Sequence, residues 1–430
     1  MGIDGLNLAI PRGTGIATYA RSLSACLTAL GHPVDVLYGM EIEAAASPAL
    51  RQVAFFDQLQ TERGFRRPRY PSLRWARLML AARRGLTAVP IPIDGLVEAR
   101  PFADRLPRCE RILNIESLFG LAGQYFRNFG RFVTVRIPDP PAIMHWTYPV
   151  PVILEGAHNI YTIHDMVPLR MPYATLDHKP THAKLIAECL RRGDHICTVS
   201  ERSREDVFSF FPDAEPDRVS NSYQAVLPPA RIQSGAEVAT LLRDGFGLQP
   251  GGYFLFFGSI EPKKNVARLL QAHFAADHGI PLVIVTARGW QAAAEAALLA
   301  GRDATDGRIR QIEYVPQDLL ATLVRGARAV TFPSLYEGFG LPVLEAMLAG
   351  TPVLTSREGS LAEVAGDAAL YVDPYDVDSI AQGLQRLATD DALCSSLRER
   401  GRLQAAQFSM AQYQARLRAL YDTVLARPAR

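Results

Sequence analysis

The chain has 430 residues, 48% of them apolar, and its charges nearly cancel at +2. This length suits two domains of about 200 residues each, and the near-neutral charge argues against a protein that mainly binds nucleic acid, because such proteins need a cationic surface. Five scattered cysteines without a CxxC pair argue against a disulfide framework or a zinc site, and no apolar run approaches the ~18 residues of a membrane span.

The first residues, MGIDGLNLAI, lack the basic segment and long apolar stretch of a secretory signal, which favours a cytoplasmic protein. RGTGIATYARSL then predicts a glycine-rich loop that leads into a helix, with Gly13, Gly15 and Thr18 spaced as G-x-G-x-x-T. Asp35 follows 20 residues after Gly15, as in a dinucleotide fingerprint. Thr18 is too large for close packing of helix on strand, however, and Asp35 is expected within a strand. An NAD-dependent dehydrogenase is therefore the weaker interpretation.

Residues 45–135 fit the pattern of an alternating α/β domain poorly and are expected to form an insertion. Between Arg63 and Arg84 lie eight arginines and no acid, interleaved with aromatic and apolar residues. A solvated insertion with some core contacts explains this pattern as well as a patch for an anionic membrane surface or a lipid-diphosphate acceptor does.

MHWTYPVP places His145, Trp146 and Tyr148 after a predicted short strand. Aromatic residues in such a loop can stack on a sugar ring, and core packing explains the same residues equally well.

From about Asn159 onward, short apolar runs alternate with amphipathic stretches, which is typical of βα units around a parallel sheet. NIYTIHD predicts a strand that ends at His164 and Asp165, and HICTVS predicts the next strand. A histidine at the end of a strand can donate to a sugar hydroxyl or carry a proton, although it is more often structural. SERSREDVFSFF predicts a helix capped by Ser200, and the Leu-Pro-Pro break at 227–229 predicts the hinge between two domains.

A second doubly wound domain is predicted after the hinge. YFLFFG, PLVIVTA, ARAVTFPS and PVLTS predict strands, and residues 265–274, LLATLVRGA and LPVLEAMLAG predict helices, the last ended by Gly350. Ligands of such sheets bind beyond the carboxyl ends of the strands, so the chemistry is expected in the segments that follow each strand.

FFGSIEPKKNVARLL is the first such segment, and it places Lys263 and Lys264 near the start of a helix that Asn265 is expected to cap. Two cations beside the positive end of a helix favour an anion between them. Solvated lysines are the weaker interpretation.

YEGFGLPVLEAM is the strongest signal. Gly338 and Gly340 allow a tight turn, and Pro342 suits a first helical turn, so the free amides form a seat for phosphate. Glu337 and Glu345 flank this seat and can accept hydrogen bonds from hydroxyls on either side of a phosphate. A diphosphate with a sugar at one end and a ribose at the other satisfies the arrangement better than an ordinary helix start does.

Together these segments resemble the retaining glycosyltransferase family 4, whose GT-B fold has two Rossmann-like, doubly wound parallel-sheet domains that face a central cleft. The resemblance lies in TGIATY, MHWTYP, the HD at His164, TVSERS, GSIEPKKN, the Glu-x7-Glu string from Glu337, GTPVLTS and LAEVAGDAALYVDP. It covers most of the chain except the basic insertion. It implies an acceptor-side domain over 1–228, a nucleotide-sugar-binding domain over 229–405, and a final helix over 406–430 that packs back towards the first domain.

The resemblance also implies roles for single residues. Lys264 would contact the donor diphosphate, Glu345 the ribose hydroxyls, and Glu337 the donor sugar. His164 would touch the sugar from the N-terminal domain. The predicted catalytic residues are thus Glu337, His164 and Lys264, and the predicted substrate-binding residues are Gly15, His145, Lys263, Tyr314, Val315, Gly338, Phe339, Gly340, Leu341 and Glu345. Many members carry arginine at the position of Ser259, and Lys263 is expected to supply that charge here.

The donor is expected to be a nucleotide diphosphate sugar, with no cofactor and no metal, because Lys264 and the amide dipoles can stabilise the leaving diphosphate. The DxD at Asp376 and Asp378 is expected to begin a helix. No residue stands out as a covalent nucleophile, so front-face substitution is the hypothesis.

The PKKN form of the lysine loop resembles that of bacterial mannosyltransferases and favours GDP-mannose. The expected acceptor is a glycan or a polyprenyl-diphosphate-linked oligosaccharide of surface polysaccharide synthesis, met at the inner face of the membrane. The alternatives are another GT-B nucleotide-sugar enzyme, such as an epimerase, and an idle sugar-binding scaffold.

Overall fold

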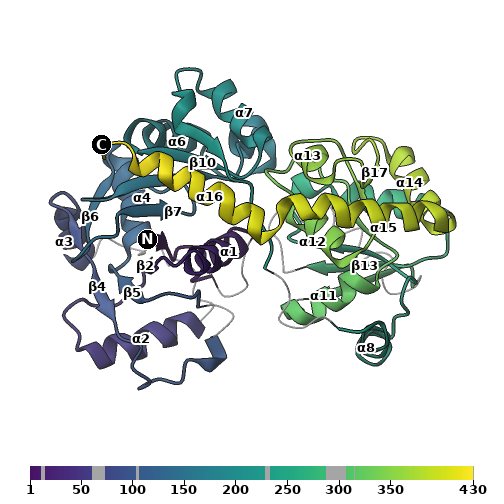
Figure 1. Cartoon of the computed structure of the whole chain (residues 1–430), viewed down its shortest axis with the longest axis horizontal. Helices are drawn as coiled ribbons and strands as arrows, with labels where there is room; N and C mark the ends of the chain where they lie inside the picture. Colours follow the sequence, from purple (N-terminus) through teal and green to yellow (C-terminus); the bar gives the residue numbers. More distant parts are fainter. Residues whose placement is uncertain are drawn as a thin grey trace.

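The computed structural model describes residues 1–10, 15–60, 73–102, 106–227, 233–286, 307–313 and 315–429. Pro228, Pro229 and Tyr314, and the arginines between 63 and 69, lie outside these ranges. The chain forms two lobes side by side, each built around its own sheet (Figure 1).

The N-terminal lobe contains an eight-stranded sheet in the order β11-β10-β9-β7-β1-β2-β5-β4, parallel except at the edge strand β4. Its strands are β1 (Gly2–Asp4), β2 (Asp35–Tyr38), β4 (Val89–Ile91), β5 (Arg111–Asn114), β7 (Ile143–Trp146), β9 (His158–Ile163), β10 (His195–Thr198) and β11 (Val219–Asn221). A second, three-stranded sheet contains β3 (Leu86–Thr87), β6 (Val133–Arg136) and β8 (Val152–Leu154). The helices are α1 (Gly15–Ala29), α2 (Pro48–Gln60), α3 (Leu73–Ala82), α4 (Leu118–Phe129), α5 (Val167–Arg170), α6 (Lys179–Arg192) and α7 (Glu201–Phe210).

The C-terminal lobe contains a parallel six-stranded sheet in the order β14-β13-β12-β15-β16-β17. Its strands are β12 (Phe254–Phe257), β13 (Leu282–Thr286), β14 (Ile309–Glu313), β15 (Ala329–Phe332), β16 (Val353–Thr355) and β17 (Leu370–Tyr371). The helices are α8 (Gly235–Leu241), α9 (Val266–Ala275), α11 (Gln317–Gly326), α12 (Leu341–Ala349), α13 (Leu361–Ala365), α14 (Val377–Thr389) and α15 (Asp391–Ala405). The strands and helices predicted after the hinge are confirmed, because each apolar run is long enough to be buried in the sheet.

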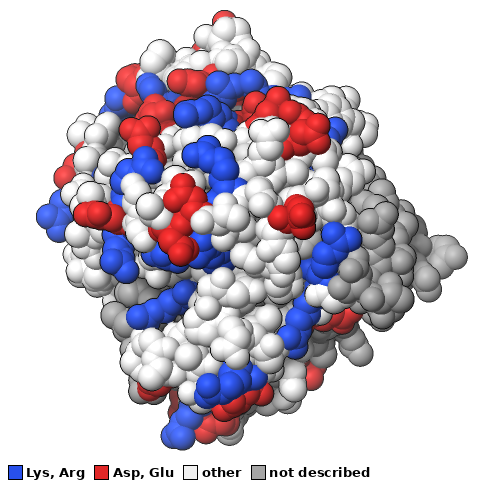
Figure 2. Space-filling model, turned by 90° about the vertical axis from the view of Figure 1, so that its right-hand side faces the viewer, with Lys and Arg blue, Asp and Glu red and all other residues white. Residues whose placement is uncertain are grey.

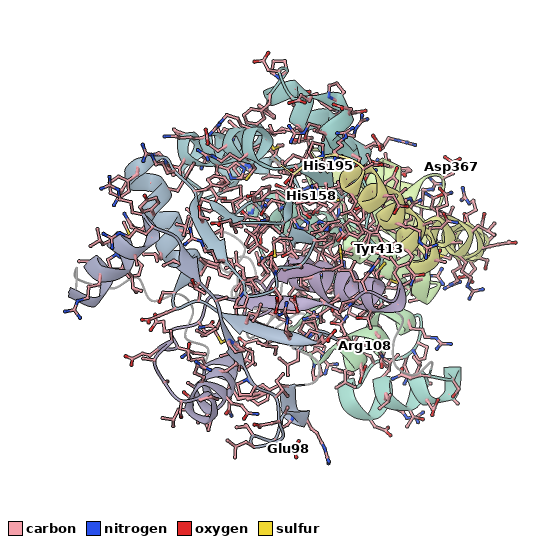
Figure 3. The ribbon with its side chains drawn as sticks, turned by 60° about the vertical axis from the view of Figure 1, so that its left-hand side comes forward. Glu98, Arg108, His158, His195, Asp367 and Tyr413 are labelled. Carbon is pink, nitrogen blue, oxygen red and sulfur yellow. The ribbon has the colours of Figure 1, made fainter. Side chains whose placement is uncertain are left out.

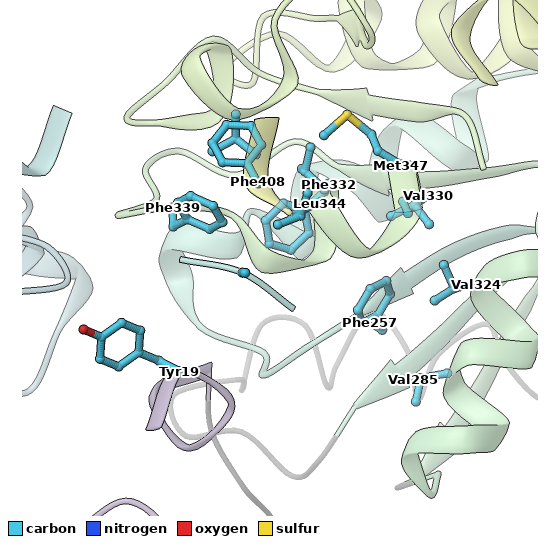
Figure 4. Close-up of a cluster of buried hydrophobic side chains, with 14 of the residues drawn as sticks. Tyr19, Phe257, Val285, Val324, Val330, Phe332, Phe339, Leu344, Met347 and Phe408 are labelled. Carbon is cyan, nitrogen blue, oxygen red and sulfur yellow. The ribbon is translucent and has the colours of Figure 1, made fainter. Parts of the chain in front are cut away.

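The core of the C-terminal lobe shows why these runs fold as they do. Phe257, Val285 and Val330 come from three adjacent strands, and Leu344 and Met347 come from α12 (Figure 4). All five side chains are almost completely buried. The helix that follows the YEGFG loop is therefore held against the sheet by its apolar face, and this packing fixes where the loop lies.

The predicted insertion over 45–135 requires a correction, because it contains part of the main sheet. β5 pairs in parallel with β2, from Asp35 opposite Arg111 to Tyr38 opposite Asn114. The strand is only four residues long and begins and ends with polar side chains, so it lacks the apolar run by which the other strands were recognised.

The last helix, α16 (Met410–Leu425), leaves the C-terminal lobe and crosses the N-terminal lobe beside α1 (Figure 1). Tyr413, labelled in Figure 3, is fully buried on this helix. The chain thus crosses between the lobes a second time, and both termini lie on the N-terminal lobe. The exact domain boundaries stay a prediction.

The surface of the C-terminal lobe in Figure 2 carries lysines and arginines interspersed with aspartates and glutamates. Within the described ranges, each helix is either too short or too polar to span a bilayer.

Candidate active site

Loops from the carboxyl ends of both sheets meet between the lobes. The His164–Asp165 segment follows β9, and Gly338 belongs to the loop between β15 and α12. A Cβ atom on Gly338 would overlap the carbonyl oxygen of His164 and lie 2.9 Å from Cβ of Asp165. Only glycine permits this approach, so the predicted YEGFG loop and the predicted His164–Asp165 segment face each other across the lobe boundary.

Lys264 and Glu337 form a close ion pair, with Nζ of the lysine 2.6 Å from Oε1 of the glutamate. Their side chains are only 13% and 7% exposed, and the ammonium lies 4.8 Å from the centre of the Phe332 ring. Lys264 ends a short 3-10 turn, η5 (Pro262–Lys264), that directs it towards the YEGFG loop. The structure therefore brings Lys264 of the PKKN loop together with Glu337 of the YEGFG loop.

Lys263 reaches across the lobes and lies 3.4 Å from Oδ2 of Asp165. Burial lowers the pKa of Lys263, but the nearby carboxylates of Asp165 and Glu337 outweigh this and raise it above its usual value. Burial likewise acts to raise the pKa of Asp165, and Lys263 outweighs this and lowers it. Both groups are charged, and each predicted lysine has a protein carboxylate as partner. The chain therefore supplies a carboxylate partner for each lysine, and the bound anion beside them stays a prediction.

His164 is oriented by the backbone. Its Nε2 lies 2.8 Å from the carbonyl oxygen of Thr147 and must carry the proton of that hydrogen bond, so Nδ1 of the neutral ring is an acceptor. Burial lowers the pKa of His164, which keeps the ring neutral at pH 7. The Tyr19 ring packs edge-on against it at 5.0 Å between centroids. Nδ1 of His164 can thus accept a hydrogen bond, whereas the sequence predicts a donor or a proton carrier.

The YEGFG loop has the geometry of an anion seat. Gly340 has φ 101° and precedes α12, in which Pro342 occupies the first turn. In the described chain, the amides of Phe339, Gly340 and Leu341 donate to no other group. A Cβ on Gly15 would lie 3.5 Å from Leu341, so the start of α1 also lies beside this seat.

Glu345 lies inside α12, on the turn after the seat. Burial raises the pKa of its carboxyl to about 7. No hydrogen bond or ion pair to this carboxyl occurs in the part of the chain that the structure describes. Val315 is nearly buried, and Tyr314 lies outside the described residues.

His145 does not belong to the site, and its prediction as a substrate-binding residue requires correction. Its ring is fully buried, with Nδ1 2.8 Å from the hydroxyl of Tyr421 and Nε2 2.8 Å from Oγ1 of Thr162. Trp146 lies in β7, stacked on Tyr161, and is equally buried. His145 joins the sheet to α16, whereas Trp146 belongs to the separate core cluster that contains Tyr161, and the sequence alone could not reveal either arrangement.

One further expectation requires correction. Asn265 occupies the position before α9, but its side chain donates to the carbonyls of Pro333 and Pro374 and does not cap the helix. The expectation that Asp35 lies in a strand is confirmed, since it is the first residue of β2. It pairs with Arg111 at 2.6 Å and lies at the edge of the sheet opposite to where a ribose would bind. Ser200 and Asp376 are confirmed as caps, of α7 and α14.

Several residues around the site escaped prediction. The hydroxyl of Tyr336 donates to Asp206, and Glu363 accepts hydrogen bonds from the amides of Glu201 and Arg202 at 2.8 and 3.2 Å. These bonds join the start of α7 to the C-terminal lobe. The TVSERS segment gave the only available signal, and it indicated a helix cap alone.

Comparisons with known proteins show which family the chain resembles. A family model described as "Glycosyl transferases group 1" matches residues 245–404. The O-antigen chain mannosyltransferase B of Escherichia coli is 37% identical over 267 residues, which cover 60% of this chain and 68% of that protein.

Two solved structures share the fold over nearly the whole length. Sucrose-phosphate synthase from Thermosynechococcus elongatus matches with a TM-score of 0.64 and 17% identity, covering 99% of each chain. HepE from Anabaena, in complex with UDP-glucose, matches with a TM-score of 0.63 and 13% identity over 98% of this chain and 100% of that one. The predicted GT-B fold is confirmed.

Proposed function

We propose that this chain, which belongs to the group 1 glycosyltransferases, transfers mannose from GDP-mannose to a glycan or lipid-linked oligosaccharide of bacterial surface polysaccharide synthesis, with retention of the anomeric configuration. The observation that carries the proposal is that Glu337, the partner of Lys264, lies in the same loop as the amides of Phe339, Gly340 and Leu341, which have no acceptor among the described residues. The mannosyltransferase name of the relative from Escherichia coli supports the choice of sugar.

In the proposed chemistry, positive groups of the protein lie where negative charge develops on the leaving diphosphate. Lys264 and the amides of Phe339 and Gly340 stabilise the diphosphate as the bond to the sugar breaks. Glu337 holds Lys264 in place and accepts from the donor sugar, and the Nδ1 atom of His164 accepts from a hydroxyl on the other side. The leaving phosphate removes the proton of the acceptor on the same face of the sugar. No step requires a metal ion or a cofactor.

The direct test incubates the protein with GDP-mannose and a mannose-terminated acceptor, and follows the product by NMR. We expect an α-linked product from the α-linked donor, and unchanged turnover in excess EDTA. UDP-glucose serves as the competing donor, since HepE binds it. A β-linked product would contradict retention, and activity lost in EDTA but restored by magnesium would contradict the metal-free chemistry. Conversion of GDP-mannose into a second GDP-sugar without any acceptor would instead favour an epimerase-like enzyme.

The pH dependence of donor binding tests Glu345, which we propose binds the ribose hydroxyls. Since burial raises the pKa of this carboxyl to about 7, it is largely protonated at pH 6, and hydroxyl donors favour its ionised form. We expect the Kd of GDP-mannose to fall about tenfold from pH 6 to pH 8, the ratio that follows if only the ionised form binds.

Calorimetry with wild type and Glu345→Gln at both pH values measures this effect. The variant should bind more weakly at pH 8 and lose the dependence on pH. A wild-type Kd that stays constant across this range, or a variant that keeps the full dependence, would exclude Glu345 as the titrating group.

The cellular setting is proposed as the cytoplasm, at the inner face of the membrane. Arg74, Arg77, Arg83 and Arg84 belong to the basic stretch in or near α3, whose earlier part lies outside the described residues. Anionic lipid would attract such a stretch, by about 1 kcal/mol for each arginine close to the surface.

A further inference from the structure

The carbonyl of Gly338 is held from the opposite lobe. Oγ of Ser200 donates to it at 2.6 Å, and Oγ of Ser203 lies 3.2 Å from the same oxygen. Ser203 also donates to the carbonyl of His164 at 2.8 Å. Both serines are fully buried at the start of α7, so these bonds form away from water.

This carbonyl shares a planar peptide group with the amide of Phe339. In a trans peptide the C=O and the following N–H point in opposite directions. Fixing the oxygen on Ser200 therefore turns the Phe339 N–H away from α7. That amide has no acceptor in the described chain and belongs to the proposed phosphate seat.

We propose that Ser200 is a positioning residue that aims the Phe339 amide at the donor diphosphate from the N-terminal lobe. The inference rests on the proposed function and adds a requirement to it. The seat belongs to the C-terminal lobe, but its geometry is complete only when α7 of the other lobe is docked. Binding of the donor diphosphate and docking of the two lobes are therefore coupled through the peptide group that joins Gly338 and Phe339.

The docking of α7 is itself well secured. Glu363 from α13 accepts from the first two amides of α7, and Tyr336 donates to Asp206 on the same helix. The ring of Phe339 packs against the ring of Phe408, with 5.6 Å between their centroids (Figure 4). Phe408 lies in η6 (Ala406–Phe408), where the chain crosses back to the N-terminal lobe. The contacts of Glu363, Tyr336 and Phe408 do not involve the Ser200 hydroxyl, whereas Ser203 is bonded to Ser200 Oγ through both its amide and its hydroxyl, at 3.0 Å each.

The test compares the Kd of GDP with that of guanosine, which lacks the diphosphate, in wild type, Ser200→Ala and Ser200→Thr; UDP and uridine serve as a parallel pair. We expect Ser200→Ala to raise the Kd of GDP about tenfold, as for loss of one hydrogen bond to a charged group, and to change the Kd of guanosine by no more than about twofold. Ser200→Thr keeps both the cap and the donor and should restore GDP binding. Ser209→Ala, at an exposed position of the same helix, is the matched control.

Each result has a defined meaning. Equal GDP binding by wild type and Ser200→Ala would overturn the inference alone. Equal weakening of GDP and guanosine, or failure of threonine to rescue, would also overturn it, because the serine would then act only through general structure. If wild type binds neither GDP nor UDP, the proposed function fails, and this inference fails with it.

Discussion

Replacing Lys264 by alanine should lower kcat/KM for the donor about a hundredfold, because one preorganised charge on a leaving group is typically worth ~3 kcal/mol. Because the Lys264–Glu337 pair is largely buried, we also expect an effect on stability that loss of a solvent-exposed lysine would not give. The Glu337 side chain is 7% exposed and would be left buried without its partner. Stranding one member of a buried pair costs about 3–5 kcal/mol. We therefore expect the melting temperature to fall together with the activity.

A double variant separates these two effects. In Lys264→Met with Glu337→Gln, no charge is stranded, so the melting temperature should return most of the way to that of wild type. Activity should remain at least a hundredfold below that of wild type, because the positive charge at the diphosphate is still missing. Lys184→Ala, at an exposed position of α6, is the control for loss of a lysine. More than half of wild-type turnover in the stable double variant would show that neither residue serves the donor.

Replacing Gly338 by alanine should abolish transfer almost completely while each lobe stays folded. The new Cβ would overlap the carbonyl oxygen of His164 and press on Asp165. A backbone carbonyl cannot swing aside as the end of a side chain can, so either the lobes separate or the YEGFG loop shifts. Displacement of about 1 Å in a positioned site costs on the order of a hundredfold in rate, and here both sides of the site move.

Steady-state kinetics and the Kd of GDP-mannose measure the effect of this substitution. Circular dichroism checks that the secondary structure is retained. Gly245→Ala is the matched control, because a Cβ there meets nothing within 4 Å. If Gly338→Ala retained half of the wild-type kcat/KM, the two lobes would not need to meet at this point during the reaction.

Much of the fold and the core of the candidate site could be predicted from local sequence. PLVIVTA and ARAVTFPS are runs of apolar residues long enough for a buried strand, and the structure forms β13 and β15 there. Gly340, with φ 101°, indicates the turn into α12 because few other residues tolerate that conformation, and Pro342 indicates the first helical turn because proline is disfavoured deeper in a helix. Backbone chemistry of this kind depends on near neighbours in the chain, so it can be recognised without the fold.

The tertiary structure alone decided which groups pair. Ser200 and Gly338 are 138 residues apart, and Lys264 and Glu337 are 73 apart. The sequence predicts that His145 binds substrate, but Tyr421 of α16, 276 residues later in the chain, contacts its ring in the folded protein. Local propensity cannot encode such contacts, because they arise from the pairing of β12 with β15 in the C-terminal sheet, from the packing of one lobe on the other and from the return of the last helix. The amino-acid sequence determined where the phosphate seat begins, and the docking of the two lobes determined which side chains hold its carbonyl.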